Sequence, residues 1–160
     1  MLLGDHFKQL KQKYHNIFFS GICFDHREIK KNYIFFAIKG NNLDGNNFIT
    51  LAIKKGCKII VTEKNFDEYK NGVLFIKTKN IRKLLAQISF NIFKKKPNNL
   101  IAVTGTNGKS SVSEFYYQIL RLNNKKVASI GTLGVRSSNF NLNLSNTTID
   151  PINLGKILNK

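Results

Sequence analysis

The chain has 160 residues, a length that suits one ordinary domain or two small ones. It is 42% hydrophobic and 22% charged, a balance that excludes an intrinsically disordered protein. No apolar run is long enough to span a membrane, and residues 1–14 are too polar and charged for a secretory signal, so we expect a cytoplasmic protein without a membrane partner.

The formal net charge of +17 raises the alternative of a nucleic-acid-binding module. The lysines are dispersed, however, and no aromatic residues are interleaved with the run at 94–96. Lys, Asn, Ile and Phe are all abundant, so we attribute the charge to compositional drift and expect no nucleic-acid partner. Cys23 and Cys57 lack metal-site spacing, and we expect both to be buried and reduced.

Hydrophobic patterning predicts alternating strands and helices in the first part of the chain. Apolar and aromatic runs predict strands at 17–24, 32–38, 58–61 and 73–76. Helical spacing of apolar residues predicts helices at 5–14, 48–56 and 81–92. This alternation predicts an α/β fold with a largely parallel sheet.

A domain boundary is predicted at 94–99, because three lysines, Pro97 and two asparagines follow the last of these helices. We therefore expect an N-terminal domain at 1–97 and the beginning of a second domain at 98–160. In the second, residues 100–103 predict a buried parallel strand and residues 112–120 a helix with an apolar stripe. A further strand is predicted at 127–132 and a helix at 152–158.

The segment between the strand at 100–103 and the following helix is typical of a phosphate-binding loop. Gly105 and Gly108 let the backbone approach an anion, Lys109 can reach the outer phosphates, and the Ser110 hydroxyl is placed to bind Mg²⁺. The strict P-loop pattern fails, because Val103 stands where its first glycine is required. The alternative is a structural glycine turn, which leaves Lys109 and Ser110 unexplained.

The run Thr104-Gly105-Thr106-Asn107-Gly108-Lys109-Ser110 resembles the shortened nucleotide loop of the Mur ligase family, whose relatives include folylpolyglutamate synthases and cyanophycin synthetases. The resemblance implies ATP and Mg²⁺ as cofactors, with Lys109 neutralising phosphate charge in catalysis and Ser110 holding the metal. The ATP-binding residues that it implies are Gly105, Thr106, Asn107, Gly108, Lys109, Ser110 and Ser111.

Two stretches in the first domain extend the resemblance. Phe24-Asp25-His26-Arg27 and residues 35–45 are similar to the Asp-Ser-Arg and Phe-x-Ala-x-x-Gly…Asp-Gly elements of the family's UDP-sugar-binding domain. His26 stands where the family usually has the serine that contacts uridine diphosphate. Without the resemblance, Asp25 and Arg27 predict an ion pair at a strand end, and residues 40–45 an ordinary turn. The UDP-MurNAc-binding residues that it implies are Phe24, His26, Asn41, Asn42 and Leu43.

Two later stretches, at 130–135 and 146–151, resemble the branch of the family that adds the third stem-peptide residue. The resemblance implies that Asn146, Thr147 and Thr148 contact the muramoyl end of the substrate, although Ile149 stands where the family usually has proline. Thr106 favours the same branch, because the ligase that adds the next residues usually has serine there.

The resemblance implies a ligase of peptidoglycan synthesis. ATP would phosphorylate a carboxylate of UDP-MurNAc-L-Ala-D-Glu, and diaminopimelate or lysine would attack the acyl phosphate. The family's further metal ligands, carbamylated lysine and amino-acid-binding domain would lie beyond residue 160, so we expect these residues to be inactive alone and a complementing chain to carry the missing domains. The alternatives are another ligase of the superfamily, such as the D-Ala-D-Ala-adding one, and a non-catalytic nucleotide- or UDP-sugar-binding fragment.

Overall fold

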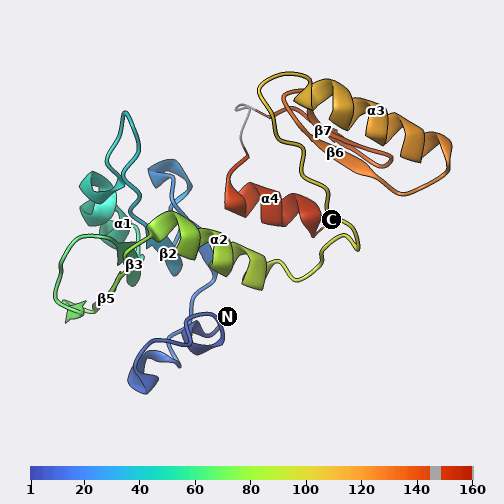
Figure 1. Cartoon of the computed structure of the whole chain (residues 1–160). Helices are drawn as coiled ribbons and strands as arrows, with labels where there is room; N and C mark the ends of the chain where they lie inside the picture. The colour runs from blue at the N-terminus through green and yellow to red at the C-terminus, as the bar shows by residue number, and fades with distance from the viewer. Residues whose placement is uncertain (145–148, 160) are drawn as a thin grey trace. The chain divides into compact units, whose positions relative to one another are not determined.

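The computed structural model describes residues 1–144 and 149–159 (Figure 1). Contacts divide the chain into two compact units, which are described separately. The first comprises Met1–Lys95 together with helix α4 (Pro151–Leu158), and the second is Lys96–Asp150. The division after Lys95 lies beside the predicted boundary, whereas the helix at the C-terminal end, which we expected in the second domain, packs in the first unit. The assignment of these units to functional domains stays a prediction.

The first unit contains a five-stranded sheet in the order β1-β2-β3-β5-β4. Its strands are β1 (Gly21–Cys23), β2 (Tyr33–Phe36), β3 (Ile59–Thr62), β4 (Tyr69–Lys70) and β5 (Val73–Lys77). The pairs β1–β2, β2–β3 and β3–β5 are parallel, and the short edge strand β4 is antiparallel to β5. The α/β fold class and the parallel-dominated sheet are therefore confirmed.

The central strands are buried on both faces, as expected of a parallel sheet covered by helices. Alternate residues divide between two cores. One core packs under α2 (Ile81–Ile92) and includes Ile34, Phe36, Ile59, Val61, Leu74 and Ile76. The other packs under α1 (Ile49–Lys54) and includes Phe35, Ile60, Phe75 and the free thiols Cys23 and Cys57. Burial raises the pKa of Cys23 to about 12 and that of Cys57 to about 11, as expected of inert thiols.

Helix α4 runs beside α2 (Figure 1). Ile152 of α4 is 3% exposed and belongs to the core under α2. Gly155 permits the close approach, because a Cβ built there would lie 2.4 Å from Cδ2 of Phe93. This packing explains why α4 groups with a sheet that is distant in sequence.

The start of the chain differs from the prediction. Residues 5–14 form no α-helix, and the first 14 residues instead contain the 3-10 turns η1 (Leu3–Asp5) and η2 (Gln12–Tyr14). The backbone N–H groups of Leu3 and Gly4 donate to the carbonyls of Ile17 and His15, at 2.9 and 3.0 Å. Within 5–14 the backbone forms isolated turns, with bonds from the N–H of Leu10 to the carbonyl of Phe7 at 3.1 Å and from the N–H of Tyr14 to the carbonyl of Lys11 at 3.0 Å. The strand predicted at 17–24 is correspondingly confined to β1, with an isolated bridge between Leu2 and Phe18 before it.

The second unit contains helix α3 (Lys109–Leu122) beside a small sheet (Figure 1). The sheet consists of β6 (Ala128–Gly131), β7 (Gly134–Ser137) and β8 (Asn141–Leu142), paired antiparallel in that order. The helix and the strand at 127–132 are confirmed, but the described strands of this unit form an antiparallel sheet where we expected a parallel one.

The prediction of a buried strand at 100–103 is wrong. These residues adopt no regular secondary structure, and Leu100 and Ile101 are 72% and 58% exposed. A parallel strand needs neighbours to pair its backbone groups, and none of the described strands pairs with this segment.

Within the described parts of the chain, no helix is long and apolar enough to cross a bilayer.

Candidate functional site

The loop before α3 has the backbone geometry of an anion-binding helix start. Gly108 is the N-cap with φ +76°, a left-handed conformation that glycine adopts without strain. The first N–H groups of a helix, here those of Lys109, Ser110 and Ser111, have no intrahelical acceptor. Residues 101–112 are all exposed, so an anion could reach these donors and the positive end of the helix dipole.

The side chain of Lys109 folds back over the loop. Its Nζ donates to the carbonyl of Gly105 and, at 2.9 Å, to that of Thr106. The ammonium group is thereby held inside the loop that the sequence assigned to phosphates. An arriving phosphate would offer charged oxygens in place of these two neutral carbonyls, which favours transfer of the ammonium to the ligand.

Two pairs of hydroxyls join α3 to the β6–β7 hairpin. Ser110 Oγ lies 2.8 Å from Oγ1 of Thr132, which is in the turn of the hairpin. Nearly one helical turn further along, Ser113 Oγ lies 2.9 Å from Oγ of Ser129. The sequence motif contained Thr132, but we assigned no role to it, because a pairing across 22 residues has no local signal.

A charged pair continues this contact. Arg136 Nη1 of β7 donates to Glu114 Oε1 of α3 at 2.5 Å, and the Arg136 guanidinium lies over the ring of Tyr117, 5.6 Å from its centroid. Tyr117 is 3% exposed. These contacts fix the helix against the hairpin and so fix the position of Ser110 relative to the turn.

The loop fits the phosphates of a nucleotide better than it fits a bare metal ion. Lys109 and the N–H groups of the first turn suit phosphate oxygens, and Ser110 offers one neutral oxygen to a cation. Among the described residues, no group of three or more His, Cys, Asp and Glu side chains could hold a metal. Mg²⁺ commonly keeps several waters and takes oxygens from phosphates, so the loop suits Mg²⁺ that arrives with a nucleotide.

A second cluster lies after β1 in the first unit. Asp25 is the N-cap of the turn η3 (His26–Glu28) and accepts a hydrogen bond from the Arg27 backbone N–H at 2.8 Å. Arg27 Nη2 also lies 2.5 Å from Asp25 Oδ2, which confirms the predicted ion pair at the strand end. The side-chain hydrogen bond from Arg27 is the main reason why the pKa of Asp25 falls to about 2.

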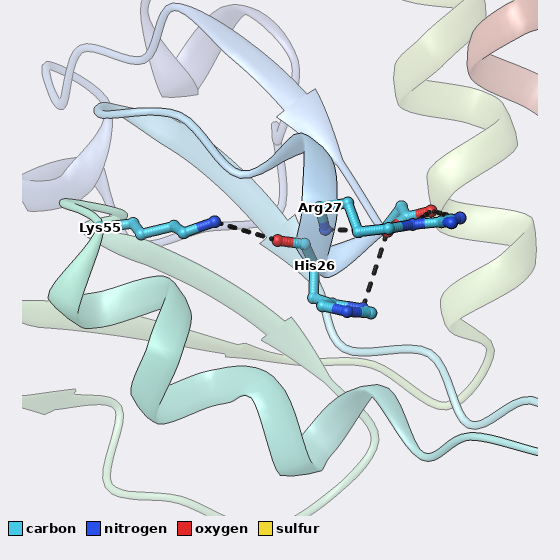
Figure 2. Close-up of polar contacts among 4 residues, drawn as sticks. His26, Arg27 and Lys55 are labelled. Carbon is cyan, nitrogen blue, oxygen red and sulfur yellow. Dashed lines mark hydrogen bonds and ion pairs between the residues drawn. The ribbon is translucent and has the colours of Figure 1, made fainter.

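His26 is fixed from two sides. Its ring stacks on that of Phe48, with centroids 4.0 Å apart and planes at 6°. Its carbonyl accepts a hydrogen bond from Lys55 Nζ at 3.4 Å (Figure 2). We did not assign Phe48 or Lys55 to the site, because both contacts join residues distant in sequence. Phe24, beside this turn, is half-buried and packs against the core under α2.

The loop after β2 presents polar side chains at the same edge of the parallel sheet, since the carboxyl ends of β1 and β2 adjoin. Gly40 N–H donates to the carbonyl of Leu43 at 2.8 Å, which closes the turn. Gly45 starts the turn η4 (Gly45–Phe48) in close contact with backbone, because a Cβ there would lie 2.6 Å from the N and O of Ile38. The exposed residues between β2 and η4 are Lys39, Asn41, Asn42 and Leu43.

The predicted residues therefore fall into two groups. Those assigned to ATP lie in the second unit, and Phe24, His26, Asn41, Asn42 and Leu43 lie at one sheet edge of the first. Asn146, Thr147 and Thr148 lie outside the described residues. The role of each residue stays a prediction.

A lysine-bearing glycine loop at a helix start is typical of proteins that bind phosphates. Comparison with known families narrows this class. Residues 19–91 match the model described as "Mur ligase family, catalytic domain", and residues 103–160 match the "Mur ligase middle domain". The chain belongs to the Mur ligase family.

Three similar curated relatives share the name UDP-N-acetylmuramoyl-L-alanyl-D-glutamate–2,6-diaminopimelate ligase. The protein of this name from Rickettsia conorii is 39% identical over 160 residues, covering 97% of this chain and 32% of the relative. The one from Rickettsia felis is 41% identical over 158 residues, covering 94% of this chain and 28% of the relative. The one from Caldanaerobacter subterraneus is 38% identical over 120 residues, covering 74% of this chain and 25% of the relative. The chain thus spans about a third or less of the length of these relatives.

Solved structures share the fold. A structure titled UDP-N-acetylmuramoyl-L-alanyl-D-glutamate–2,6-diaminopimelate ligase matches with a TM-score of 0.80 at 21% identity, covering 99% of this chain and 33% of that one. At this identity the likeness shows the fold. The MurF ligase from Thermotoga maritima, solved in complex with ADP, matches with a TM-score of 0.51 at 25% identity, covering 66% of this chain and 23% of its own.

Proposed function

We propose that this chain supplies the substrate-binding domain and the nucleotide loop of an ATP-dependent Mur ligase that adds diaminopimelate to UDP-MurNAc-L-Ala-D-Glu in the cytoplasm during peptidoglycan synthesis. The observation that carries the proposal is the loop at the start of α3, with Lys109 and Ser110 at a helix N-terminus. The names of the relatives support diaminopimelate rather than lysine as the added residue.

In this proposal the loop prepares the transfer of the γ-phosphate to the substrate's carboxylate. Lys109 leaves the carbonyls of Gly105 and Thr106 and neutralises phosphate charge, while Ser110 offers its oxygen to Mg²⁺. Thr106, Asn107, Gly108 and Ser111 surround the phosphates with N–H groups and hydroxyls. ATP supplies the activated phosphoryl group, and Mg²⁺ spreads its negative charge.

The sheet edge of the first unit binds the UDP-MurNAc end of the substrate. Arg27 is exposed and offers positive charge, while His26 offers a ring nitrogen that is oriented by its stacking on Phe48. The side chains of Asn41, Asn42 and Leu43 face solvent beside this turn. We propose that Asn146, Thr147 and Thr148 contact the muramoyl end.

Ligation requires more of the protein than these residues provide. The described residues hold no cluster of metal-binding side chains, and bond formation depends on holding two substrates in reactive geometry. We therefore propose that further polypeptide, continuous with this chain or separate from it, supplies the remaining metal ligands and the pocket for the amine. A preparation of these 160 residues alone should form no tripeptide.

A chimera tests this function. The 160 residues replace the aligned segment of the Rickettsia conorii relative, and the product is assayed with ATP, Mg²⁺, UDP-MurNAc-L-Ala-D-Glu and diaminopimelate. We expect tripeptide and ADP in equal amounts, and at least about 10-fold less product when the chimera carries Lys109→Ala. Lysine in place of diaminopimelate should be a poor substrate.

An inactive but folded chimera would contradict the proposed activity. If that chimera still bound both ATP and UDP-MurNAc-dipeptide, the non-catalytic binding fragment would be the better account. The small share of each relative that this chain covers is the observation that keeps this second candidate open.

A further inference from the structure

We propose that Thr132 is a positioning residue for Ser110: its hydroxyl oxygen accepts a hydrogen bond from the Ser110 hydroxyl and thereby directs the Ser110 oxygen toward the cation that accompanies the nucleotide. The inference rests on the proposed nucleotide function and adds a residue to it. The observation behind it is the 2.8 Å separation of Ser110 Oγ and Thr132 Oγ1.

A hydroxyl that binds a cation is better oriented when it has such a partner. A serine that gives a lone pair to a cation keeps its O–H bond, and the cation makes this proton a stronger hydrogen-bond donor. An unconstrained hydroxyl rotates among three staggered positions. An acceptor on the side away from the cation selects one of them, and Thr132 Oγ1 is within hydrogen-bond distance of Ser110 Oγ.

The hairpin holds Thr132 in place. Gly131 of β6 pairs with Gly134 of β7, so Thr132 and Leu133 form a two-residue turn. Gly134 has φ +85°, and a Cβ there would lie 2.3 Å from the Leu142 carbonyl, so the turn is seated closely against β8. Both Ser110 and Thr132 are exposed, which leaves room for a ligand beside the hydroxyl pair.

The neighbouring hydroxyl pair provides a matched comparison. Ser113 and Ser129 join the same helix to the same hairpin at 2.9 Å, but Ser113 is beyond the first helical turn. If the hydroxyl contacts only fix α3 to the hairpin, then loss of either pair should have the same effect on nucleotide binding, with or without Mg²⁺. If Thr132 acts on the Ser110 oxygen, only loss of its hydroxyl should change how Mg²⁺ affects nucleotide binding.

The test measures ADP binding to the 160-residue chain by calorimetry, once with Mg²⁺ and once with EDTA. The quantity compared is the dissociation constant in EDTA divided by the dissociation constant with Mg²⁺. This ratio reports how much the cation strengthens nucleotide binding within one protein. Thr132→Val, which keeps the side-chain shape, should lower this ratio by about 3- to 10-fold, the value of one hydrogen bond. Thr132→Ser should restore it, and Ser129→Ala should leave it unchanged.

Two results would overturn the inference. In the first, the ratio for Thr132→Val equals that of the unchanged chain, and equal weakening with and without Mg²⁺ would then assign Thr132 a structural role. In the second, Ser129→Ala lowers the ratio as much as Thr132→Val does. Failure of the unchanged chain to bind ADP under either condition would contradict the proposed function itself, and this inference with it.

Discussion

Helices α2 and α3 carry the same kind of apolar stripe but differ in what covers it. On α2, Ile81, Leu85 and Ile88 are 3%, 2% and 1% exposed against the five-stranded sheet. On α3, Phe115, Ile119 and Leu122 are 64%, 57% and 82% exposed.

The side of α3 that meets its hairpin is instead the polar one, with Ser113, Glu114 and the buried ring of Tyr117. An amphipathic pattern thus predicts a helix in both places, but burial of the stripe depends on a partner that sequence periodicity does not specify. The comparison predicts a stably packed first unit and a second unit held chiefly by polar contacts.

The largest difference should appear in limited proteolysis. The exposed segments of the second unit, including residues 101–112, should be cleaved first, because few buried contacts oppose local opening. The cleavage should leave α4 bound to α2, since Ile152 and Gly155 pack in the first unit. Gel filtration followed by denaturing electrophoresis should show two fragments that elute together. Early cuts within β2 or β3, or separation of the α4 fragment, would contradict the comparison.

Two phenylalanine truncations should differ by several kcal/mol. Phe36 is fully buried in the core under α2, and Phe36→Ala should lower the free energy of unfolding of the first unit by about 3–5 kcal/mol. Phe115 on α3 is the matched control, and Phe115→Ala should change stability by about 0.5 kcal/mol or less. Urea unfolding followed through amide signals of β2 and β3, and separately of α3, measures both. Equal losses would show that the stripe of α3 is covered in solution.

A smaller effect concerns pH. The Nδ1 atom of His6 is buried without a hydrogen-bond partner among the described residues, and burial lowers its pKa below the usual 6.5. The folded state therefore favours the neutral ring. The neutral His6 ring therefore contributes fully to the free energy of unfolding above pH 6.5, the ordinary pKa of the unfolded chain. This contribution is lost as the pH falls through the lower pKa of the folded state. Unfolding measured from pH 7.5 to 5 should show this loss in the unchanged chain relative to His6→Gln. A difference between the two proteins that stays constant with pH would refute it.

Local signals in the sequence sufficed for the first sheet and much of the candidate loop. The apolar runs at β3 and β5 and the stripe of α2 were predicted closely, because each is buried by neighbours within the same unit. The apolar stripe at 112–120 predicted α3 within three residues of each of its observed ends. These features depend on interactions that short segments largely determine.

The remaining features depend on contacts between distant segments. Residues 100–103 read as a buried strand but lack a paired neighbour among the described residues. The stacking of His26 on Phe48 and the contact of Ser110 with Thr132 each cross about twenty residues, and no periodicity indicates such pairs. Side-chain contacts between segments distant in sequence are therefore the part of a site that sequence patterns predict least well.

The central claim, that the loop before α3 binds nucleotide phosphates through Lys109, is tested most directly by titrating the chain with ATP and Mg²⁺ in a calorimeter. Lys109→Ala should weaken binding by about 1.5–3 kcal/mol, the value of a charge-assisted contact. Lys126→Ala, beyond the other end of α3, keeps the net charge of the Lys109→Ala variant and should bind as the unchanged chain does. Equal ATP affinities for the unchanged chain and Lys109→Ala would contradict the claim.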